Sequence, residues 1–462
     1  GLVMTNHHCA RGSVSNVSQD GESLLDDGFY AAVQEDERRI EDYYADQLVE
    51  IRDVTGQVND AVAAAGEDSQ ARASAREAAV EEIEAAVLAE YGGEDGGHVV
   101  EVISLYNGGR TSAYVFRRFD DVRLVFAPEL QIGFFGGDPD NFTYPRYNLD
   151  MSFYRIYEDE APYRPEFYFP FSTEGVSEGD PVFVIGNPGS TSRLQTVAEL
   201  EFRRDVSDKA VLDFIDSRVE VLGAFIEAEP EVAESLDLRN SYFSLANSQK
   251  AYGGQIEGLH DPYIVARRGA QEAEFQAALS ADSALFAEYG GLVDRMAEIQ
   301  DRKRGFAAEY AAFLGATAPE YGSATLVRAL YAFQLLASRS GGAPEEALEG
   351  LRSELEGVPQ LPESLEAALI EARLADFQRA WGEDSPVVEN ILQGRTPEGF
   401  TAFLLSSSAL ADSASAMEAI ETGELRMTDP AIAVIQGILP RIGAFQSAMA
   451  QFAPEEEEIS AC

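Results

Sequence analysis

Residues 98–126 read HVVEVISLYNGGRTSAYVFRRFDDVRLVF, which contains three runs rich in β-branched and aromatic residues. The runs cover 98–106, 114–116 and 122–126, and an Asn-Gly-Gly turn and an Asp-Asp turn separate them. β-branched and aromatic side chains are enriched in strands, and turns this short join antiparallel neighbours. The stretch therefore predicts an antiparallel sheet.

Further β patterns lie on both sides of this stretch. Residues 151–157 and 181–186 predict two more strands, and the apolar run Leu2-Val3-Met4 predicts a buried strand. Between residues 35 and 91, a charged stretch rich in Ala and Glu predicts one or two surface helices inserted between strands. The first part of the chain is therefore interpreted as mainly β.

The composition changes after about residue 203, where strand patterns stop and apolar residues recur at helical spacing. One such series is Val211, Ile215, Val219, Leu222 and Ile226. We predict an α+β chain with a β domain at 1–202, an all-α domain at 203–455 and the start of a further segment at 456–462.

Three helix starts are marked by a capping residue followed by proline: Ser385-Pro386, Thr396-Pro397 and Asp429-Pro430. A short polar side chain at the N-cap and a proline at the first helical position are typical of helix N-termini.

The composition excludes several classes of function. The 462 residues include 81 acidic and 34 basic side chains, a formal charge of −47, and 45% are hydrophobic. Such a chain builds about two or three globular domains and repels phosphate backbones and anionic lipids. No apolar run reaches the roughly 18 residues that a membrane span needs. We therefore expect neither a nucleic-acid partner nor membrane insertion.

The two cysteines and the two ends of the chain carry less information. Cys9 and Cys462 form neither a disulfide framework nor a cysteine-rich metal site. The apolar start lacks a polar lead-in, and Glu455–Cys462 lacks a closing element, so we expect the natural sequence to continue at both ends.

Two of the four histidines, His7 and His8, directly follow the apolar run. Histidine suits proton transfer near neutral pH, so one of the two is a candidate general base. The alternatives are a histidine pair in a turn and half of a metal site. The metal alternative is weaker because adjacent side chains on a strand point to opposite faces. A histidine acting as a general base needs an orienting carboxylate, and Asp150, at the start of the predicted strand 150–157, is the candidate.

Five ordered blocks lie along the first part of the chain: GLVMTNHHC (1–9), DDGFY (26–30), IRDVT (51–55), DVRLVFAPE (121–129) and GGDPDNFTYPR (136–146) leading to Asp150. Together they resemble peptidase family S46, the dipeptidyl-peptidase 7 and 11 family of serine exopeptidases. In addition, EGDPVFVIGNPG (178–189) resembles the first strand of the second barrel of trypsin-like bacterial proteases.

The resemblance implies a chymotrypsin-like antiparallel double β-barrel, incomplete here, that is interrupted by a large inserted all-α domain. It places the general base on His8 and its orienting carboxylate on Asp150, and it leaves His7 a structural role. The substrate's amino terminus would bind Asn141 and, from the helical domain, Asn247. Phe142 stands where the family has tryptophan, so an aromatic wall remains but the indole N–H is lost.

The nucleophilic serine of the family lies in a Gly-Asn-Ser-Gly-Ser-Pro type of motif, which these 462 residues lack. The resemblance implies that it follows Cys462. The nearest imitation, Gly186-Asn187-Pro188-Gly189-Ser190, makes Ser190 a poor substitute. The chain taken alone is therefore expected to be inactive.

We predict a serine-type hydrolase that releases dipeptides from the free N-terminus of oligopeptides. A catalytically inactive peptide-binding pseudo-peptidase is the alternative. No cofactor and no metal is implied, and the sequence leaves open whether the protein forms a homodimer. The family resemblance also implies a protein exported to the periplasm, to the cell surface or out of the cell.

Overall fold

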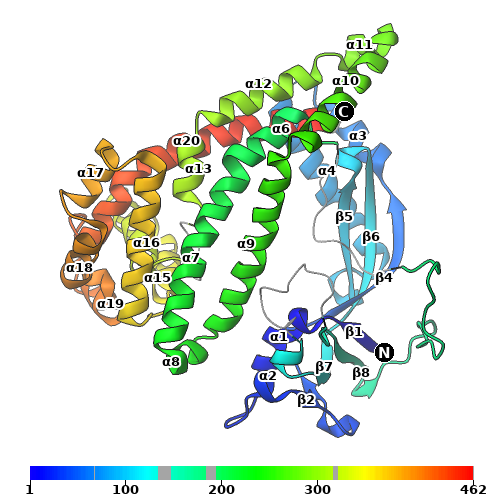
Figure 1. Cartoon of the computed structure of the whole chain (residues 1–462), viewed down its shortest axis with the longest axis horizontal. Helices are drawn as coiled ribbons and strands as arrows, with labels where there is room; N and C mark the ends of the chain where they lie inside the picture. The colour runs from blue at the N-terminus through cyan, green and yellow to red at the C-terminus, as the bar shows by residue number, and fades with distance from the viewer. Residues whose placement is uncertain (67, 134–146, 184–193, 316–320, 461–462) are drawn as a thin grey trace. The chain divides into compact units, whose positions relative to one another are not determined.

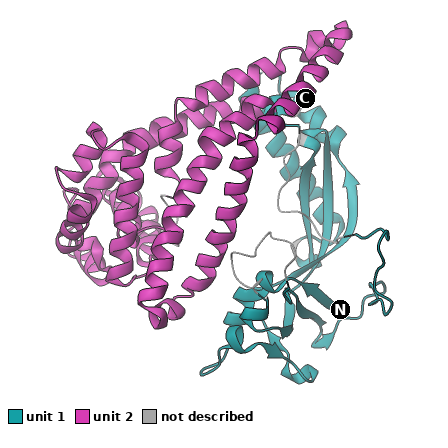
Figure 2. Ribbon diagram, in the orientation of Figure 1, with its two compact units in different colours: residues 1–195, 457–462 teal, residues 196–456 magenta. Residues whose placement is uncertain are grey.

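The computed structural model describes residues 1–66, 68–133, 147–183, 194–315 and 321–460 (Figure 1). The chain divides into two compact units (Figure 2). Unit 1 comprises residues 1–195 and 457–462, and unit 2 comprises residues 196–456. Unit 2 begins before the expected residue 203, at Thr196, which forms a capping box with Glu199 at the start of α6 (Val197–Phe202). This Thr-x-x-Glu pattern is a helix start signal in the sequence itself.

Unit 1 contains two antiparallel sheets. The larger has the order β1 (Leu2–Thr5), β8 (Ser152–Glu158), β7 (Asp121–Ala127), β2 (Phe29–Tyr30), with β3 (Arg38–Arg39) also on β7 and β9 (Ala161–Pro162) on β8. The smaller has the order β4 (Ala45–Asp53), β6 (Arg110–Phe119), β5 (His98–Leu105). The strands predicted from 98–126 and 151–157 are confirmed as β5, β6, β7 and β8, whereas β4 was not predicted.

The helices α3 (Thr55–Ala64) and α4 (Ser69–Glu90) lie where inserted helices were expected. Most of their residues are exposed or partly exposed, as predicted for surface helices, but both also help to build a core with the smaller sheet. The members of this core are Val54, Val58, Val62, Ile83, Val87, Val100, Ala113 and Val115. In the sequence of α4, the many alanines and glutamates make its narrow apolar stripe hard to recognise, yet this stripe packs on the sheet.

Two other expectations need correction. β1 is an edge strand rather than a buried one, and its residues Leu2 and Met4 are 50% and 60% exposed. The described part of the predicted strand 181–186 is not a strand, and Val182 and Phe183 are largely exposed. A strand exists only through its hydrogen-bonded neighbours, and no described segment pairs with 181–183. Residues 184–186 lie outside the described part of the chain.

A short helix fixes the end of β1 on the larger sheet. In α1 (His7–Asn16), the buried residues are His7, Ala10, Ser13 and Val14, which share one helical face. Ala10 and Val14 join a core with side chains of β7 and β8, including Leu124 and Tyr154. The helices α2 (Leu24–Asp27) and α5 (Leu130–Gly133) complete the regular helices of this unit that the structure describes.

The regular structure described in unit 2 is entirely helical. After α6 and a π-helical segment (Arg203–Ser207) come α7 (Asp208–Ala228), α8 (Pro230–Ser235), α9 (Leu238–His260), α10 (Pro262–Ala281), α11 (Ser283–Tyr289), α12 (Leu292–Arg304), α13 (Ala307–Phe313), α14 (Ala324–Ser340), α15 (Glu345–Glu356), α16 (Glu363–Trp381), α17 (Pro386–Leu392), α18 (Pro397–Ser407), α19 (Ser413–Glu421) and α20 (Pro430–Ser460). No helix in the described ranges is long and apolar enough to cross a membrane.

The predicted caps are confirmed at all three proline starts. Ser385 accepts the Val388 N–H at 3.3 Å, Thr396 accepts the Gly399 N–H at 3.1 Å, and Asp429 accepts the Ala431 N–H at 2.9 Å.

Residues 456–460, where a further segment was predicted to start, form the end of α20. Basic side chains face this acidic end. Within unit 1, Glu457 pairs with Arg76 at 3.0 Å and Glu458 with Arg72 at 2.6 Å. Residues 461 and 462 lie outside the described part.

Candidate active site

Strand pairing brings His8 and Asp150 together. β1 and β8 are antiparallel, and Thr5, the last residue of β1, lies opposite Ser152, the first residue of β8. His8 follows the end of β1 in the first turn of α1, and Asp150 comes just before β8. Two residues far apart in the sequence therefore meet at one edge of the sheet.

The distances define a closely bonded pair. His8 Nδ1 lies 2.8 Å from Asp150 Oδ2, which is within the predicted hydrogen-bond range. The main-chain N–H of His8 donates to Asp150 Oδ1 at 3.0 Å. Asn6 Nδ2 donates to Asp150 Oδ2 at 3.0 Å and to the Asp150 carbonyl oxygen at 3.1 Å. The carboxylate is thus held at both oxygens.

The electrostatics of the pair favour an ionised carboxylate beside an accessible imidazole. The side chain of His8 is 41% exposed, whereas that of Asp150 is 11% exposed. Burial alone would raise the pKa of Asp150, but the hydrogen bonds from the side chain and main chain of His8 and from Asn6 hold that pKa below its ordinary value. A buried carboxylate that stays charged can orient an imidazole and stabilise its protonated form.

His7 faces the interior and is 0% exposed. A Cβ added at Gly133 would lie 2.5 Å from His7 Nδ1, so the backbone of Gly133 packs directly against the imidazole. Burial, followed by the charge of Arg11, lowers the pKa of His7 to about 4. His7 is therefore a neutral core residue at neutral pH, and it lies on a different face of α1 from His8.

The thiol that follows His8 is not activated. Cys9 is a free cysteine. Partial burial, and then the negative charge of Asp150, raise the pKa of this thiol above its ordinary value. A nucleophilic cysteine needs the opposite shift.

The other predicted site residues lie outside the described ranges or in unit 2. Asn141, Phe142 and Ser190 lie outside the described residues. Asn247 is an exposed residue of α9 in unit 2. The described residues hold no group of three or more His, Cys, Asp or Glu side chains arranged for a metal ion.

Asn6, which was not predicted as a site residue, contacts both the main chain and the side chain of Asp150. Asparagine directly before a helix usually caps that helix, so its position in Thr5-Asn6-His7-His8 carries no signal of a contact across the sheet.

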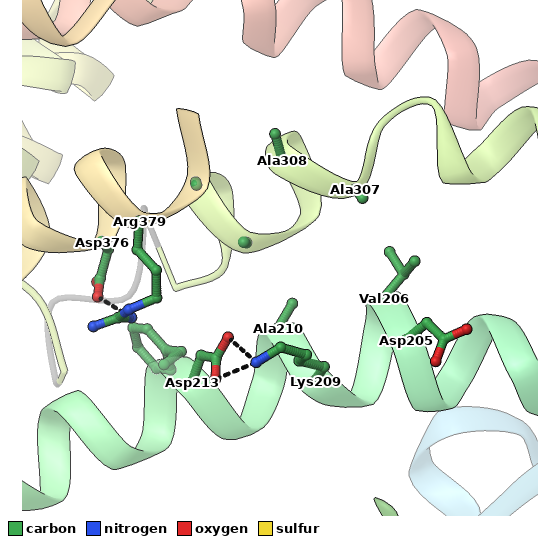
Figure 3. A pocket seen from close by; sticks show the side chains of 12 residues that line it. Asp205, Val206, Lys209, Ala210, Asp213, Ala307, Ala308, Asp376 and Arg379 are labelled. Carbon is green, nitrogen blue, oxygen red and sulfur yellow. Dashed lines mark hydrogen bonds and ion pairs between the residues drawn. The ribbon is translucent and has the colours of Figure 1, made fainter. Parts of the chain in front are cut away.

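A separate cavity of about 310 Å³ lies in unit 2 between α7, α13 and α16 (Figure 3). The apolar part of its lining consists of five alanines with Val206 and Phe214. The charged groups around it are already paired: Lys209 with Asp213 at 2.8 Å, and Arg379 with Asp376 at 3.2 Å. None of the predicted site residues lines this cavity.

Comparisons with known proteins agree with the resemblance seen in the sequence. A family model described as Peptidase S46 matches residues 1–461. An Asp/Glu-specific dipeptidyl-peptidase from Capnocytophaga gingivalis is 31% identical over 304 residues, which are 63% of this chain and 41% of that protein. A dipeptidyl-peptidase 7 from Porphyromonas endodontalis is 34% identical over 290 residues, which are 60% of this chain and 34% of that protein.

Among solved structures, DPP11 of Porphyromonas endodontalis in complex with the dipeptide Arg-Glu matches with a TM-score of 0.80 at 20% identity. The match covers 100% of this chain and 68% of that chain, and it shows that the two share a fold of mixed sheet and helix. The matched regions of the two curated relatives are 41% and 34% of their lengths, so the chain spans well under half of each. Because the family model covers nearly all of its residues, the chain belongs to peptidase family S46.

Proposed function

We propose that the full-length protein containing this chain is a serine dipeptidyl peptidase. It releases dipeptides from the free N-terminus of oligopeptides. In this proposal the two sheets of unit 1 belong to a chymotrypsin-like double β-barrel, and unit 2 is the inserted helical domain. The observation that carries the proposal is the 2.8 Å contact between His8 Nδ1 and a largely buried Asp150 carboxylate.

The mechanism follows from this pair. With Nδ1–H donating to Asp150, the other ring nitrogen of His8 takes the proton from a serine hydroxyl beyond residue 462 as the serine oxygen attacks the carbonyl carbon of the peptide. The scissile C–N bond then breaks, and the leaving amine takes that proton. Water, deprotonated by His8 in turn, attacks the carbonyl carbon of the acyl-enzyme. The ester C–O bond then breaks, the serine oxygen takes the proton from His8, and the dipeptide leaves.

The amine anchor is assigned to Asn141, Phe142 and Asn247. A protonated amine taken out of water needs acceptors, since its burial costs several kcal/mol otherwise. Two asparagine carbonyl oxygens provide acceptors, and the phenyl ring of Phe142 provides an aromatic wall. An enzyme with this anchor cuts only at a fixed distance from a free N-terminus.

The test compares peptides with free and acetylated N-termini as substrates of the full-length protein. We expect release of dipeptides from the free peptide only. Asn141→Ala should lower kcat/KM by a factor that corresponds to about 1–3 kcal/mol of lost hydrogen bonding. Labelling by a serine-directed acylating reagent should persist. Equal cleavage of acetylated and free peptides would contradict the exopeptidase. Binding of peptides without any cleavage would support the pseudo-peptidase instead.

We also propose that the full-length protein is exported to the periplasm or cell surface, in line with the family resemblance. Cell fractionation with a cytoplasmic marker checks this, and recovery of the protein with that marker would contradict it.

A further inference from the structure

The side chain of Asn6 does not do what its position in the chain predicts. Asn6 is the N-cap of α1, with an extended backbone of φ −74° and ψ 149°. An N-cap asparagine normally accepts a hydrogen bond from the second or third N–H of its helix. Asn6 makes no such bond. Its Nδ2 donates instead to the carbonyl oxygen and to Oδ2 of Asp150, at 3.1 Å and 3.0 Å.

Asp150 supplies the cap that Asn6 does not provide. The N–H of His8, the second residue of α1, donates to Asp150 Oδ1 at 3.0 Å. Asp150, which precedes the neighbouring strand β8, therefore satisfies the N-terminus of α1, and the N-cap residue Asn6 bonds to Asp150 instead of to its own helix. Both groups that Asn6 contacts accept hydrogen bonds only, so the contact requires the amide nitrogen as donor.

We propose that Asn6 is a positioning residue for the His8–Asp150 pair, an inference that rests on the proposed function. By bonding the main chain and the carboxylate of one residue, Asn6 opposes rotation of the carboxylate away from His8. Asn6 also shares Oδ2 with His8 Nδ1, which lies 2.8 Å from the same oxygen. A second donor on that oxygen reduces the negative charge that the His8 ring experiences.

The decisive variant is Asn6→Asp in the full-length protein. Aspartate has the same shape and is as good an N-cap, but it cannot donate and it places a second carboxylate against Asp150. We expect kcat/KM to fall about 10- to 100-fold through kcat, with KM changed by no more than about twofold. Asn16→Asp is the matched control, because it makes the same change at an exposed position at the other end of α1. It should leave kcat unchanged.

A pH profile separates positioning from a structural role. Removing the donor leaves more negative charge for His8, so the acid limb of kcat/KM should move to higher pH in Asn6→Ala and further in Asn6→Asp. The NMR titration of the His8 ring should shift in the same order, and this readout does not depend on activity. If Asn6 served only as an N-cap, the uncharged variant Asn6→Ala would leave the acid limb and the His8 titration in place.

These outcomes distinguish the two proposals. If the wild type releases no dipeptides but the His8 titration shifts as expected, the proposed function is wrong and the positioning contact stands. If the wild type cleaves and Asn6→Asp retains both its kcat and its pH profile, the inference about Asn6 is wrong and the proposed function stands.

Discussion

The candidate site depends on the helical face that each of two adjacent histidines occupies. Neighbouring residues of an α-helix are about 100° apart around its axis. His7 turns into the interior against the backbone of Gly133 and is 0% exposed, whereas the His8 side chain is 41% exposed and reaches Asp150. A single helical step therefore separates a structural imidazole from one that is available for proton transfer.

The buried His7 predicts a pH dependence of stability. Its pKa falls from 6.5 in the unfolded chain to about 4 in the folded one, so between these values the unfolded chain binds one more proton. Stability from this residue is complete above pH 6.5 and is lost as the pH falls towards 4, by about 3 kcal/mol in all. Hydrogen exchange of the β1 and β8 amides measures this loss of stability, and protection should be lower at pH 4.5 than at pH 7.

The control is His7→Leu, which keeps a side chain of similar size without a titrating group. Its amides should lose less protection over the same pH interval than those of the wild type. Equal losses in the two proteins would show that His7 does not resist protonation.

The residues of the pair could be predicted from the sequence, but their surroundings could not. His8 and Asp150 stand at strand ends in recognisable blocks, and antiparallel pairing of those strands places them together. The contact of Asn6 depends on which oxygen of Asp150 caps α1, a choice that local sequence does not encode. The same holds for Gly133, whose backbone lies against His7.

At the scale of elements, unit 2 contains buried charges that fix its helices to one another. Arg218 of α7 and Arg373 of α16 are 0% and 5% exposed at their side chains. Asp376 of α16 lies 2.8 Å from Arg218 and 3.8 Å from Arg373. Desolvation lowers the pKa of Arg218, and it lowers the pKa of Arg373 to about 10. One carboxylate thus balances two buried guanidinium groups.

Asp376→Asn should therefore destabilise the packing of α7 on α16 strongly. The variant leaves two buried cations without their counter-charge, which costs about 3–5 kcal/mol. Hydrogen exchange of the α7 amides in the full-length protein measures this loss.

Asp213→Asn is a control beside the same cavity (Figure 3). It removes an ion pair with Lys209, whose side chain is 57% exposed, and should cost less than about 1 kcal/mol. If Asp376→Asn and Asp213→Asn lose equal protection, the buried ion pairs of Asp376 do not contribute more to stability than an exposed one.

Helix starts could be predicted where a capping side chain precedes a proline, because cap and proline act within a few residues. Burial of one stripe of α4 could not be predicted, because it depends on a sheet whose strands lie on both sides of this helix in the sequence. β1 illustrates the same limit, since an apolar run does not reveal whether it becomes a central or an edge strand.

At the scale of the whole molecule, the excess of acidic residues belongs to the surface. The buried carboxylates of the described residues all have hydrogen-bond or ion-pair partners. They are Glu37 with Arg155, Asp208 with Arg203, Glu309 with Arg441, Glu366 with Ser323, and Asp376 with Arg218. The excess negative charge behind the net charge of −47 therefore lies on exposed residues, where it repels polyanions. The buried carboxylates are compensated by their partners.

The order of a β region followed by a helical region could be predicted from composition alone. Composition does not predict whether such strands close into barrels, because a barrel is defined by long-range strand pairs. The segment predicted as the first strand of a second barrel shows why, since its described residues have no strand partner.

The measurement that tests the central claim most directly is kcat for dipeptide release by the full-length protein carrying Asp150→Asn. Asparagine keeps the shape of the side chain but removes the charge that orients His8, so kcat should fall by about a thousandfold or more. Asp159→Asn, at an exposed position just after β8, is the control and should retain wild-type activity. If Asp150→Asn also retains wild-type kcat, then His8 and Asp150 are not the catalytic pair of this protein.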